Sequence, residues 1–335
     1  MQRFELNSQE AKDIESVVWS HARSFSDVNS DDYHEHALIN AHELPRRLRA
    51  RLNRFRLEEP SSGILIVSGF PIDNLAIGPT PSSLEDCGLS TTTRREEAFL
   101  VLVMSLLGDT ICWSTQQSGR MIHDVFPIKQ HQDMQLGTGC KELLTWHTED
   151  AFHDVRSDYV GMLCLRNPQR VATTIASMSE ITLDEELKTQ LFREEYCILP
   201  DESHRGITDL TTQADAPTRN TIQQMLSHPQ KVAVLFGDRE KPFIRIDPYF
   251  MPLPESPALR NAYQRLVVEI DNRIKDVVLQ PGDLCIMDNF QVVHGRRPFQ
   301  ANFDGSDRWL KRVLVARDLR KSILWRDKQR TRMIT

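Results

Sequence analysis

The sequence predicts a mainly β protein with flanking helices, because helix-like and strand-like patterns occupy different parts of the chain. Up to about residue 110, apolar residues recur mostly at helical spacing. From Ile111 onward, many short apolar runs alternate with turn residues. Such a series of short strands favours a β-sandwich or a barrel. We therefore expect a helical N-terminal part at about 1–110 and a β core at about 111–320.

Length and composition indicate a soluble globular protein. The chain has 335 residues, enough for one elaborated domain or two small ones, and we expect a single domain over residues 1–335. Hydrophobic residues make up 40% and charged residues 26%, which is ordinary for such proteins. The net charge of −6, from 41 basic and 47 acidic residues, argues against nucleic acid or an anionic membrane as the main partner.

We expect a cytoplasmic protein. No apolar run approaches the roughly 18 residues that a membrane helix needs, and the first residues lack the apolar core of a signal peptide. The six cysteines show no CxxC pair, which predicts reduced thiols rather than a disulfide framework. The sequence leaves open whether the chain forms a homo-oligomer.

Three helices and one buried strand are expected in the N-terminal part. The helices cover about residues 6–24, 44–55 and 96–107, and Gly108 suits a C′ position after the third. Five arginines between Arg46 and Arg54 are interpreted as a solvated face of the second helix. An apolar run between glycines at 63–69 predicts a buried strand, and the Pro-, Ser-, Thr- and Gly-rich residues 71–93 predict a long loop.

The second part is expected to contain short strands and two helices, the latter at about 183–194 and 257–273. A polar, turn-rich stretch at about 200–220 lies between a helix and a strand, and we expect it to act as a mobile lid. The expected strands cover residues 112–117, 143–147, 159–165, 171–176, 232–236, 243–247, 277–279, 284–287 and 310–316.

The strongest chemical signal lies in the stretch 146–152, which contains His147 and Glu149. In extended backbone these two side chains leave the same face of a strand. A distant histidine, His294, is the best candidate for a third ligand. Two histidines and a carboxylate on one side of a metal form the facial triad of non-haem Fe(II) oxygenases. The His-x-Glu pair alone is weak evidence, because chance pairs of this kind are frequent.

Two arginines follow His294 at positions that suit an α-keto acid cosubstrate. Such a molecule chelates a metal through its keto-carboxylate end and needs a cation for its distal carboxylate. Arg308, fourteen residues after His294, offers a planar fork that matches a carboxylate. Arg312 follows four residues later in strand-like sequence, so alternation places both arginines on one face.

Together with these residues, seven blocks of sequence resemble the clavaminate-synthase-like branch of the Fe(II)/2-oxoglutarate-dependent dioxygenases. Within that branch the chain is most similar to the arginine 3-hydroxylase of viomycin biosynthesis, with asparagine 3-hydroxylases as cousins. The resemblance runs over most of the chain and implies a double-stranded β-helix, or jelly-roll, core. The matching blocks are residues 41–48, 115–120, 146–152, 158–161, 165–168, 293–297 and 307–312.

The resemblance implies a metal and a cosubstrate, with a role for each matching residue. His147, Glu149 and His294 would bind Fe(II). Arg308 would pair with the distal carboxylate of 2-oxoglutarate, and Thr173 would add a hydroxyl contact. Dioxygen, O₂, would be the second cosubstrate.

The resemblance also implies a small amino-acid substrate. Arg312 would hold its α-carboxylate and Gln116 its α-amino group, so that C3 is the expected target. Asp247 falls where the arginine hydroxylase places an acidic residue on the guanidinium group. Asp201 and Ser203 lie in the segment that resembles its lid.

One departure from the arginine hydroxylase concerns the far end of the substrate. That enzyme carries a second acid in an Asp-x-Asp pattern, whereas this chain has Asp247-Pro248-Tyr249. Losing a carboxylate weakens a guanidinium clamp, and Tyr249 offers a hydroxyl or a ring face instead. We therefore expect hydroxylation of a free L-amino acid in antibiotic or other specialised biosynthesis. Arginine and cyclic guanidine, ureido or amine side chains all stay open.

Other classes of function stay open at this point. One is an oxygenase or desaturase acting on a carrier-tethered amino acid or a late pathway intermediate. Another is a non-enzymatic protein that binds a metal or 2-oxoglutarate, although a structural metal needs no distal cation such as Arg308. A zinc hydrolase would need a general base, for which Asp150 is the candidate in the motif. The remaining histidines are interpreted as structural, namely His34, His36, His42, His123, His131, His153, His204 and His228.

Overall fold

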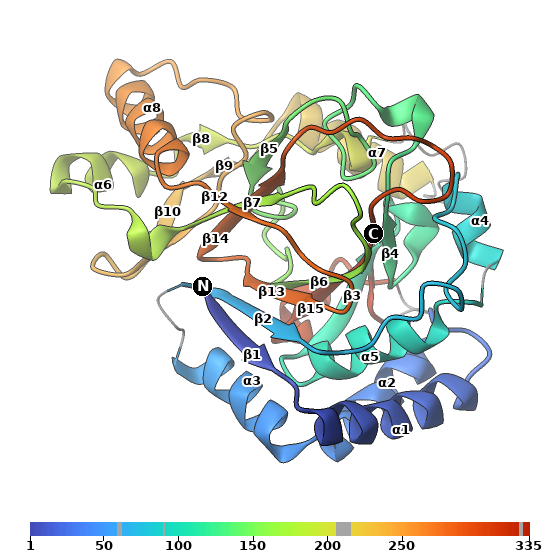
Figure 1. Cartoon of the computed structure of the whole chain (residues 1–335). Helices are drawn as coiled ribbons and strands as arrows, with labels where there is room; N and C mark the ends of the chain where they lie inside the picture. Colours follow the sequence, from blue (N-terminus) through green and yellow to red (C-terminus); the bar gives the residue numbers. More distant parts are fainter. Residues whose placement is uncertain (59–61, 90, 206–215, 328–330) are drawn as a thin grey trace.

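The computed structural model describes residues 1–58, 62–89, 91–205, 216–327 and 331–335. Helices of the N-terminal part form a layer on one side of a large sheet, in the lower half of Figure 1. The layer contains α1 (Ser8–Ser24), α2 (Asp31–Asn40), α3 (Arg46–Glu58) and α5 (Arg94–Ser105), with a 3₁₀ turn η1 (Ala41–Glu43). The short α4 (Leu84–Leu89) lies apart from it, at the right of Figure 1. The first helix begins at Ser8 because the Asn7 side chain accepts hydrogen bonds from the backbone N–H groups of Gln9 and Glu10.

The large sheet has eight strands and takes members from both ends of the chain. Its order is β1-β2-β13-β6-β15-β3-β16, and β4 pairs with β15. The strands are β1 (Gln2–Glu5), β2 (Ile64–Ser68), β3 (Asp109–Trp113), β4 (His123–Val125), β6 (Tyr159–Arg166), β13 (Leu284–Asp288), β15 (Trp309–Ala316) and β16 (Met333–Ile334).

A smaller sheet of four strands faces the large one in the order β12-β7-β14-β5. Its strands are β5 (Leu144–His147), β7 (Thr173–Ser177), β12 (Lys275–Val277) and β14 (Val292–Arg296). Two strand pairs complete the β structure, namely β8 (Tyr196–Cys197) with β9 (Lys231–Val232) and β10 (Leu235–Gly237) with β11 (Pro242–Ile244). The helical elements here are η2 (Gln117–Gly119), η3 (Lys129–His131), η4 (Met178–Glu180), α6 (Glu185–Leu191), η5 (Glu202–His204), α7 (Ala216–Ser227), α8 (Pro257–Asp271) and η6 (Leu319–Ser322).

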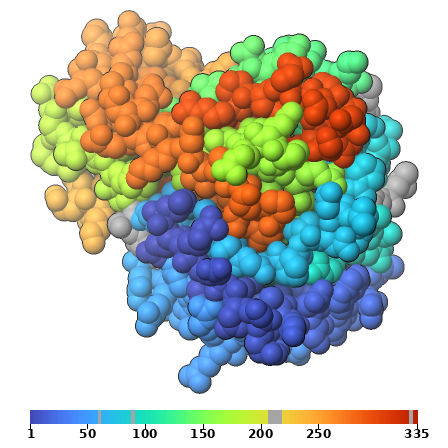
Figure 2. Space-filling view, in the orientation of Figure 1, coloured from blue at the N-terminus to red at the C-terminus, as the bar shows by residue number. Residues whose placement is uncertain are grey.

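Strand alternation places the core in layers on both faces of the large sheet. In β13, Leu284 and Ile286 belong to the apolar cluster that contains the helix residues, such as Phe99 of α5. The alternate residues of the same strand, Cys285 and Met287, belong to the cluster between the two sheets, together with Ile175 of β7. A third cluster packs α6 and α8 beside the small sheet, and these segments form the upper left lobe in Figure 2. The prediction of a mainly β core with flanking helices is confirmed.

Several local predictions need correction. The third helix ends at Ser105, and Gly108 is required instead by a close approach, because an added Cβ would lie 2.4 Å from the Ala316 carbonyl oxygen. The segment 71–93 contains α4 rather than being loop throughout. The residues expected to form one strand at 232–236 are divided between β9 and β10.

The predicted lid at about 200–220 is described in part. Its first residues form the short turn η5, and α7 begins at Ala216 inside the stretch expected to be loop. Residues 206–215 lie outside the described residues. None of the described helices is long and apolar enough to cross a membrane.

Candidate active site

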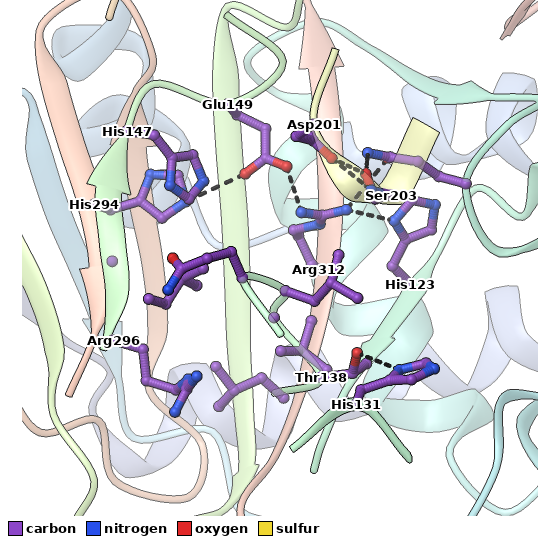
Figure 3. A pocket seen from close by; sticks show the side chains of 18 of the residues that line it. His123, His131, Thr138, His147, Glu149, Asp201, Ser203, His294, Arg296 and Arg312 are labelled. Carbon is purple, nitrogen blue, oxygen red and sulfur yellow. Dashed lines mark hydrogen bonds and ion pairs between the residues drawn. The ribbon is translucent and has the colours of Figure 1, made fainter. Parts of the chain in front are cut away.

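One pocket receives side chains from both sheets and from the loops that join them (Figure 3). The large sheet contributes residues of β4 and β15, and the small sheet contributes residues of β5, β7 and β14. All eleven residues singled out in the sequence line it, namely Gln116, His147, Glu149, Thr173, Asp201, Ser203, Asp247, Tyr249, His294, Arg308 and Arg312. The structure thus brings together residues that are up to almost 200 positions apart in sequence.

His147, Glu149 and His294 converge on one wall of the pocket. His147, the last residue of β5, lies directly opposite His294 in the antiparallel register of β5 and β14. The two ring centroids are 4.9 Å apart, and Glu149 Oε2 lies 3.2 Å from His294 Nε2. One ligand atom from each of the three residues lies within 4.8 Å of the others. Two imidazoles and a carboxylate at this spacing fit a facial divalent-metal site.

The orientation of His147 supports this fit. Its Nδ1–H donates a hydrogen bond to the Thr145 carbonyl oxygen at 2.8 Å. A carbonyl oxygen can only accept, so the lone pair of the ring is on Nε2, the other nitrogen. A backbone acceptor on the far nitrogen is the usual arrangement that orients a metal-binding histidine.

Glu149 is held at both its backbone and its carboxylate. The Asn289 side chain accepts from the Glu149 N–H at 2.7 Å and donates to the Glu149 carbonyl oxygen at 3.0 Å. Burial by itself would raise the pKa of the Glu149 carboxyl, but Arg312 and His294 outweigh burial and hold this pKa well below its usual range. The carboxylate is therefore ionised and available to a cation.

A buried arginine without an acidic partner lies at one end of the pocket. The Arg308 Nη2 donates to the Thr173 hydroxyl at 3.1 Å, and among the described residues no carboxylate pairs with this guanidinium. Burial lowers the pKa of Arg308 to about 10, so it stays charged at neutral pH. An uncompensated buried cation is costly, which indicates that this end of the pocket receives an anion.

The end of the pocket around Asp247 is acidic, in contrast to the end that contains Arg308. Asp247 Oδ1 accepts hydrogen bonds from the backbone N–H groups of Tyr249 at 3.2 Å and Phe250 at 3.3 Å. Burial, and then the nearby carboxylate of Asp201, raise the pKa of Asp247 to about 6. No cationic side chain among the described residues forms an ion pair with Asp247. Asp201 Oδ2 lies 3.9 Å from His204 Nε2, so the carboxylate that lacks a cation at this end is that of Asp247. It indicates that this end of the pocket receives a positively charged group.

Arg312 lies between these ends, next to the three converging residues (Figure 3). Its Nη1 donates to Glu149 Oε1, and its Nη2 donates to His123 Nδ1 at 2.7 Å and to Gln116 Oε1 at 3.4 Å. The Gln116 Nε2 donates in turn to the Ser203 hydroxyl at 2.8 Å. Arg312 and Gln116 therefore already connect the carboxylate of Glu149 with the segment that carries Ser203.

Comparison with known proteins gives a family for this fold and pocket. The profile described as "Taurine catabolism dioxygenase TauD, TfdA family" matches residues 84–314 of the chain. The matched segment is well over half of the 335 residues and includes every residue that lines the pocket. The chain belongs to this family.

Two relatives of this TauD/TfdA-family chain match it over nearly their whole length. An enduracididine beta-hydroxylase of Streptomyces hygroscopicus is 41% identical over 329 residues, which cover 96% of each chain. An L-ornithine/L-arginine 3-hydroxylase of Catenulispora acidiphila is 37% identical over 344 aligned residues, which cover 100% of both chains.

A solved structure shows the same fold. The non-heme iron oxygenase OrfP, in complex with Fe, succinate and (3S)-hydroxy-L-Arg, superimposes with a TM-score of 0.94. The two chains are 37% identical over 99% of each. The predicted family, the jelly-roll fold and the dioxygenase class are confirmed. The predicted iron and 2-oxoglutarate agree with another OrfP structure, which holds Fe and alpha-ketoglutaric acid.

The structure adds two histidines to the site of this dioxygenase that the sequence analysis interpreted as structural. His123 lines the pocket and accepts the hydrogen bond from Arg312. His204, two residues before the undescribed segment, donates from Nε2 to Asp150 Oδ1 at 2.9 Å. Neither histidine stands in a recognisable motif, so only the pairing of distant segments reveals them.

Asp150 is a further residue of the site, which the sequence analysis considered only as the general base of a zinc hydrolase. Its backbone has a left-handed φ of 49°, which few residues other than glycine adopt. Its carboxylate also accepts from Trp113 Nε1 at 2.7 Å and from Gln116 Nε2 at 3.2 Å. Its position directly after Glu149 is a signal, but the sequence alone suggested only a general base. With both oxygens occupied by donors, Asp150 is placed to hold the loop of Glu149.

Proposed function

We propose that the chain is an Fe(II)- and 2-oxoglutarate-dependent hydroxylase that oxidises C3 of a free L-amino acid with a basic, arginine-like side chain. The observation that carries the proposal is the charge pattern along one pocket. Among the described residues, Arg308 lies at one end without an acid, and Asp247 lies at the other end without a cation. The cluster of His147, Glu149 and His294 lies between them.

The protein's part in the reaction is to bind and orient its ligands. His147, Glu149 and His294 would hold the iron, and Arg308 with Thr173 would hold the distal carboxylate of 2-oxoglutarate. When bound, iron, 2-oxoglutarate and O₂ supply the oxidant that replaces a C–H hydrogen of the substrate by hydroxyl. Three protein ligands leave positions for these small molecules, as in a facial triad.

The substrate would be fixed at both of its ends. Arg312 would attract the α-carboxylate and Gln116 would accept from the α-ammonium group, while Asp247 would pair with the side-chain cation. Two fixed ends leave the carbons between them facing the metal, and small displacements decide which carbon reacts. Tyr249 takes the place of the second acid of the Asp-x-Asp pattern and is more than half exposed, so both open-chain and cyclic guanidines fit this end.

A substrate panel tests the proposal. Purified protein with Fe(II), 2-oxoglutarate and O₂ would be incubated with arginine, enduracididine, ornithine, lysine and citrulline. We expect one basic amino acid to gain one oxygen by mass spectrometry, with equimolar succinate. Product formation from arginine-like substrates should exceed product formation from citrulline, which has a similar size but lacks the side-chain charge.

Two controls separate this proposal from the alternatives. Loss of iron binding in His147→Ala supports the metal assignment, and retained iron together with retained activity contradicts it. Succinate formation without any oxidised amino acid would favour a carrier-tethered or larger substrate. Binding of 2-oxoglutarate without turnover of any compound would favour a sensor.

We also propose that the whole chain forms one domain and acts in the cytoplasm. The large sheet supports the first point, because β1 and β2 of the N-terminal part pair into it beside β13. All six cysteines lie among the described residues and no two of them form a disulfide, which supports the second. Gel filtration would decide whether the protein forms a homo-oligomer.

A further inference from the structure

Arg296 is a second buried arginine that lines the pocket, on the side of His294 away from Glu149 in Figure 3. It follows His294 by two residues on β14, so both side chains leave the same face of the strand. Across the ladder, Arg296 lies opposite Thr173 of β7, whose hydroxyl accepts the hydrogen bond from Arg308. Arg296 therefore lies at the same end of the pocket as Arg308.

The hydrogen bonds of Arg296 leave its charge uncompensated. Its Nη1 donates to the carbonyl oxygens of Cys140 at 3.1 Å and Arg297 at 3.3 Å, and its Nη2 donates to that of Glu142 at 3.4 Å. Carbonyl groups satisfy donors but carry no net charge. Among the described residues no carboxylate forms an ion pair with Arg296, and its side chain is 2% exposed.

Two buried arginines at one end of a pocket, neither with an acid, repel each other and lose solvation. Arginine cannot relieve this cost by losing its proton at neutral pH. The direct partner of a distal carboxylate is Arg308, whose Nη2 reaches only a hydroxyl in the structure. Arg308 and Arg296 together attract an anion to this end of the pocket more strongly than the guanidinium of Arg308 would alone.

We propose that Arg296 is a positioning residue whose charge makes the pocket select α-keto acids with a distal carboxylate. It acts through its electric field on that carboxylate and not through direct contact. This inference depends on the proposed use of 2-oxoglutarate. It adds that two residues from different segments of the chain, Arg308 and Arg296 of β14, together make the pocket prefer keto acids with a distal carboxylate over keto acids without one.

Binding measurements without turnover test the inference. The protein would be loaded with Mn²⁺ in place of iron, and calorimetry would measure the Kd of 2-oxoglutarate and of 2-oxopentanoate, which lacks the distal carboxylate. For Arg296→Gln we expect the Kd of 2-oxoglutarate to rise about tenfold, since one charge interaction over roughly 10 Å at an effective dielectric constant of about 20 has that size. The Kd of 2-oxopentanoate should stay within about a factor of two by the same reasoning.

Two further variants separate charge from packing. Arg296→Lys keeps the charge and loses the fork, so it should keep most of the selectivity for 2-oxoglutarate. The matched control is Arg297→Gln, which removes the same charge from the next residue, where Arg297 Nε pairs with Asp276 on the surface at 2.8 Å. Arg297→Gln should leave both dissociation constants unchanged.

The contrary outcomes are distinct. Two results would overturn the inference: equally weaker binding of both keto acids, or an equal loss of selectivity in Arg296→Lys and Arg296→Gln. Either would show that Arg296 only holds residues 140–142 in place. If Arg296→Gln does not fold, Arg308→Gln decides the point. A remaining preference for 2-oxoglutarate in that variant supports the inference, and complete loss of preference contradicts it. Wild-type protein that binds no 2-oxoglutarate would instead contradict the proposed function.

Discussion

The His204 Nε2–H donates a hydrogen bond to Asp150 Oδ1 across 2.9 Å, and both side chains are buried. Asp150 directly follows Glu149, whereas His204 ends the short turn that carries Ser203. The Thr115 hydroxyl lies 2.7 Å from the other ring nitrogen of His204. This contact therefore joins the loop of a proposed metal ligand to the segment proposed to lie over the substrate.

Replacement of His204 should partly uncouple the conversion of 2-oxoglutarate to succinate from the hydroxylation of the amino-acid substrate. In His204→Ala, Asp150 loses a hydrogen-bond donor, and the turn that carries Ser203 loses its contact with the Asp150 loop. The reacting groups are then less well placed, so we expect kcat for hydroxylation to fall about tenfold. Succinate released per hydroxylated product should rise above one, as measured by mass spectrometry. Iron content should not change.

The matched controls for this prediction are another histidine and a milder change. His228→Ala removes an exposed ring outside the pocket and should leave the ratio at one. His204→Gln retains a donor and should recover part of the coupling. A normal ratio in His204→Ala would show that the contact serves only folding.

Asp247→Asn should weaken recognition of the side-chain cation. The amide keeps the size of the carboxylate and removes its charge, so we expect KM for the preferred basic amino acid to rise about 10- to 100-fold, equivalent to about 1.4–2.8 kcal/mol. The kcat value should change little, because the proposed iron ligands are unaffected. Asp238→Asn, at an exposed turn between β10 and β11, is the control. An unchanged KM would remove Asp247 from the substrate site.

His21 should make the fold less stable as the pH falls. This ring is buried between α1 and α2, where Nδ1 accepts from Asn40 Nδ2 at 3.0 Å, and burial lowers its pKa from 6.5 to about 4. Between these values the unfolded chain binds a proton that the folded chain does not, so stability is lost as pH falls from 6.5 to 4. The total is on the order of 3 kcal/mol.

Urea unfolding at several pH values checks this prediction. The His21→Gln variant should lose less stability than the wild type between pH 6.5 and 4, since it has no ring to protonate. His42→Gln, at an exposed histidine of the neighbouring turn, should follow the wild-type curve. Parallel curves for wild type and His21→Gln would contradict the assignment.

Lys311 should be important for stability rather than for catalysis. It is buried in β15, where its Nζ lies 2.7 Å from Glu97 Oε1 and 2.7 Å from Asp124 Oδ1. Lys311→Met leaves the buried carboxylate of Glu97 without its cation and leaves Asp124 paired only with Arg120, which should cost about 3–5 kcal/mol. Denaturant unfolding measures the loss, and Lys241→Met at an exposed position should cost nothing measurable. A loss below 1 kcal/mol would show that water replaces the cation.

The sequence predicted best those features that depend on neighbouring residues. His147 and Glu149 share one short motif, and Arg308 directly precedes β15, which contains Arg312, so short spacing in sequence brings each pair together. Lys311, directly before Arg312, faces the helix layer because strand alternation is equally local. Apolar periodicity predicted α1, α3 and α5. It missed α2, in which polar residues dominate, and the short α4 inside the expected loop.

The features that the sequence missed depend on contacts between distant segments. His204 becomes part of the site only because the Asp150 loop and the Thr115 turn meet it in space. Gly108 was interpreted from its place after a helix, whereas the chain of β15 passes beside it. Neither relationship leaves a local pattern, so no reading of one sequence could have found them.

The two ends of the pocket are built from different kinds of structure, and this has a consequence for how its specificity can change. His147, Thr173, His294 and Arg296 lie on paired strands, where a shift of one residue would turn every side chain to the opposite face. Asp201, Ser203, Asp247 and Tyr249 lie in turns outside the sheets. Exchanging these short turn segments should therefore change the substrate that the pocket accepts, while the proposed metal and 2-oxoglutarate sites on the strands stay the same. A designer would graft residues 247–250 first and leave β5 and β14 intact.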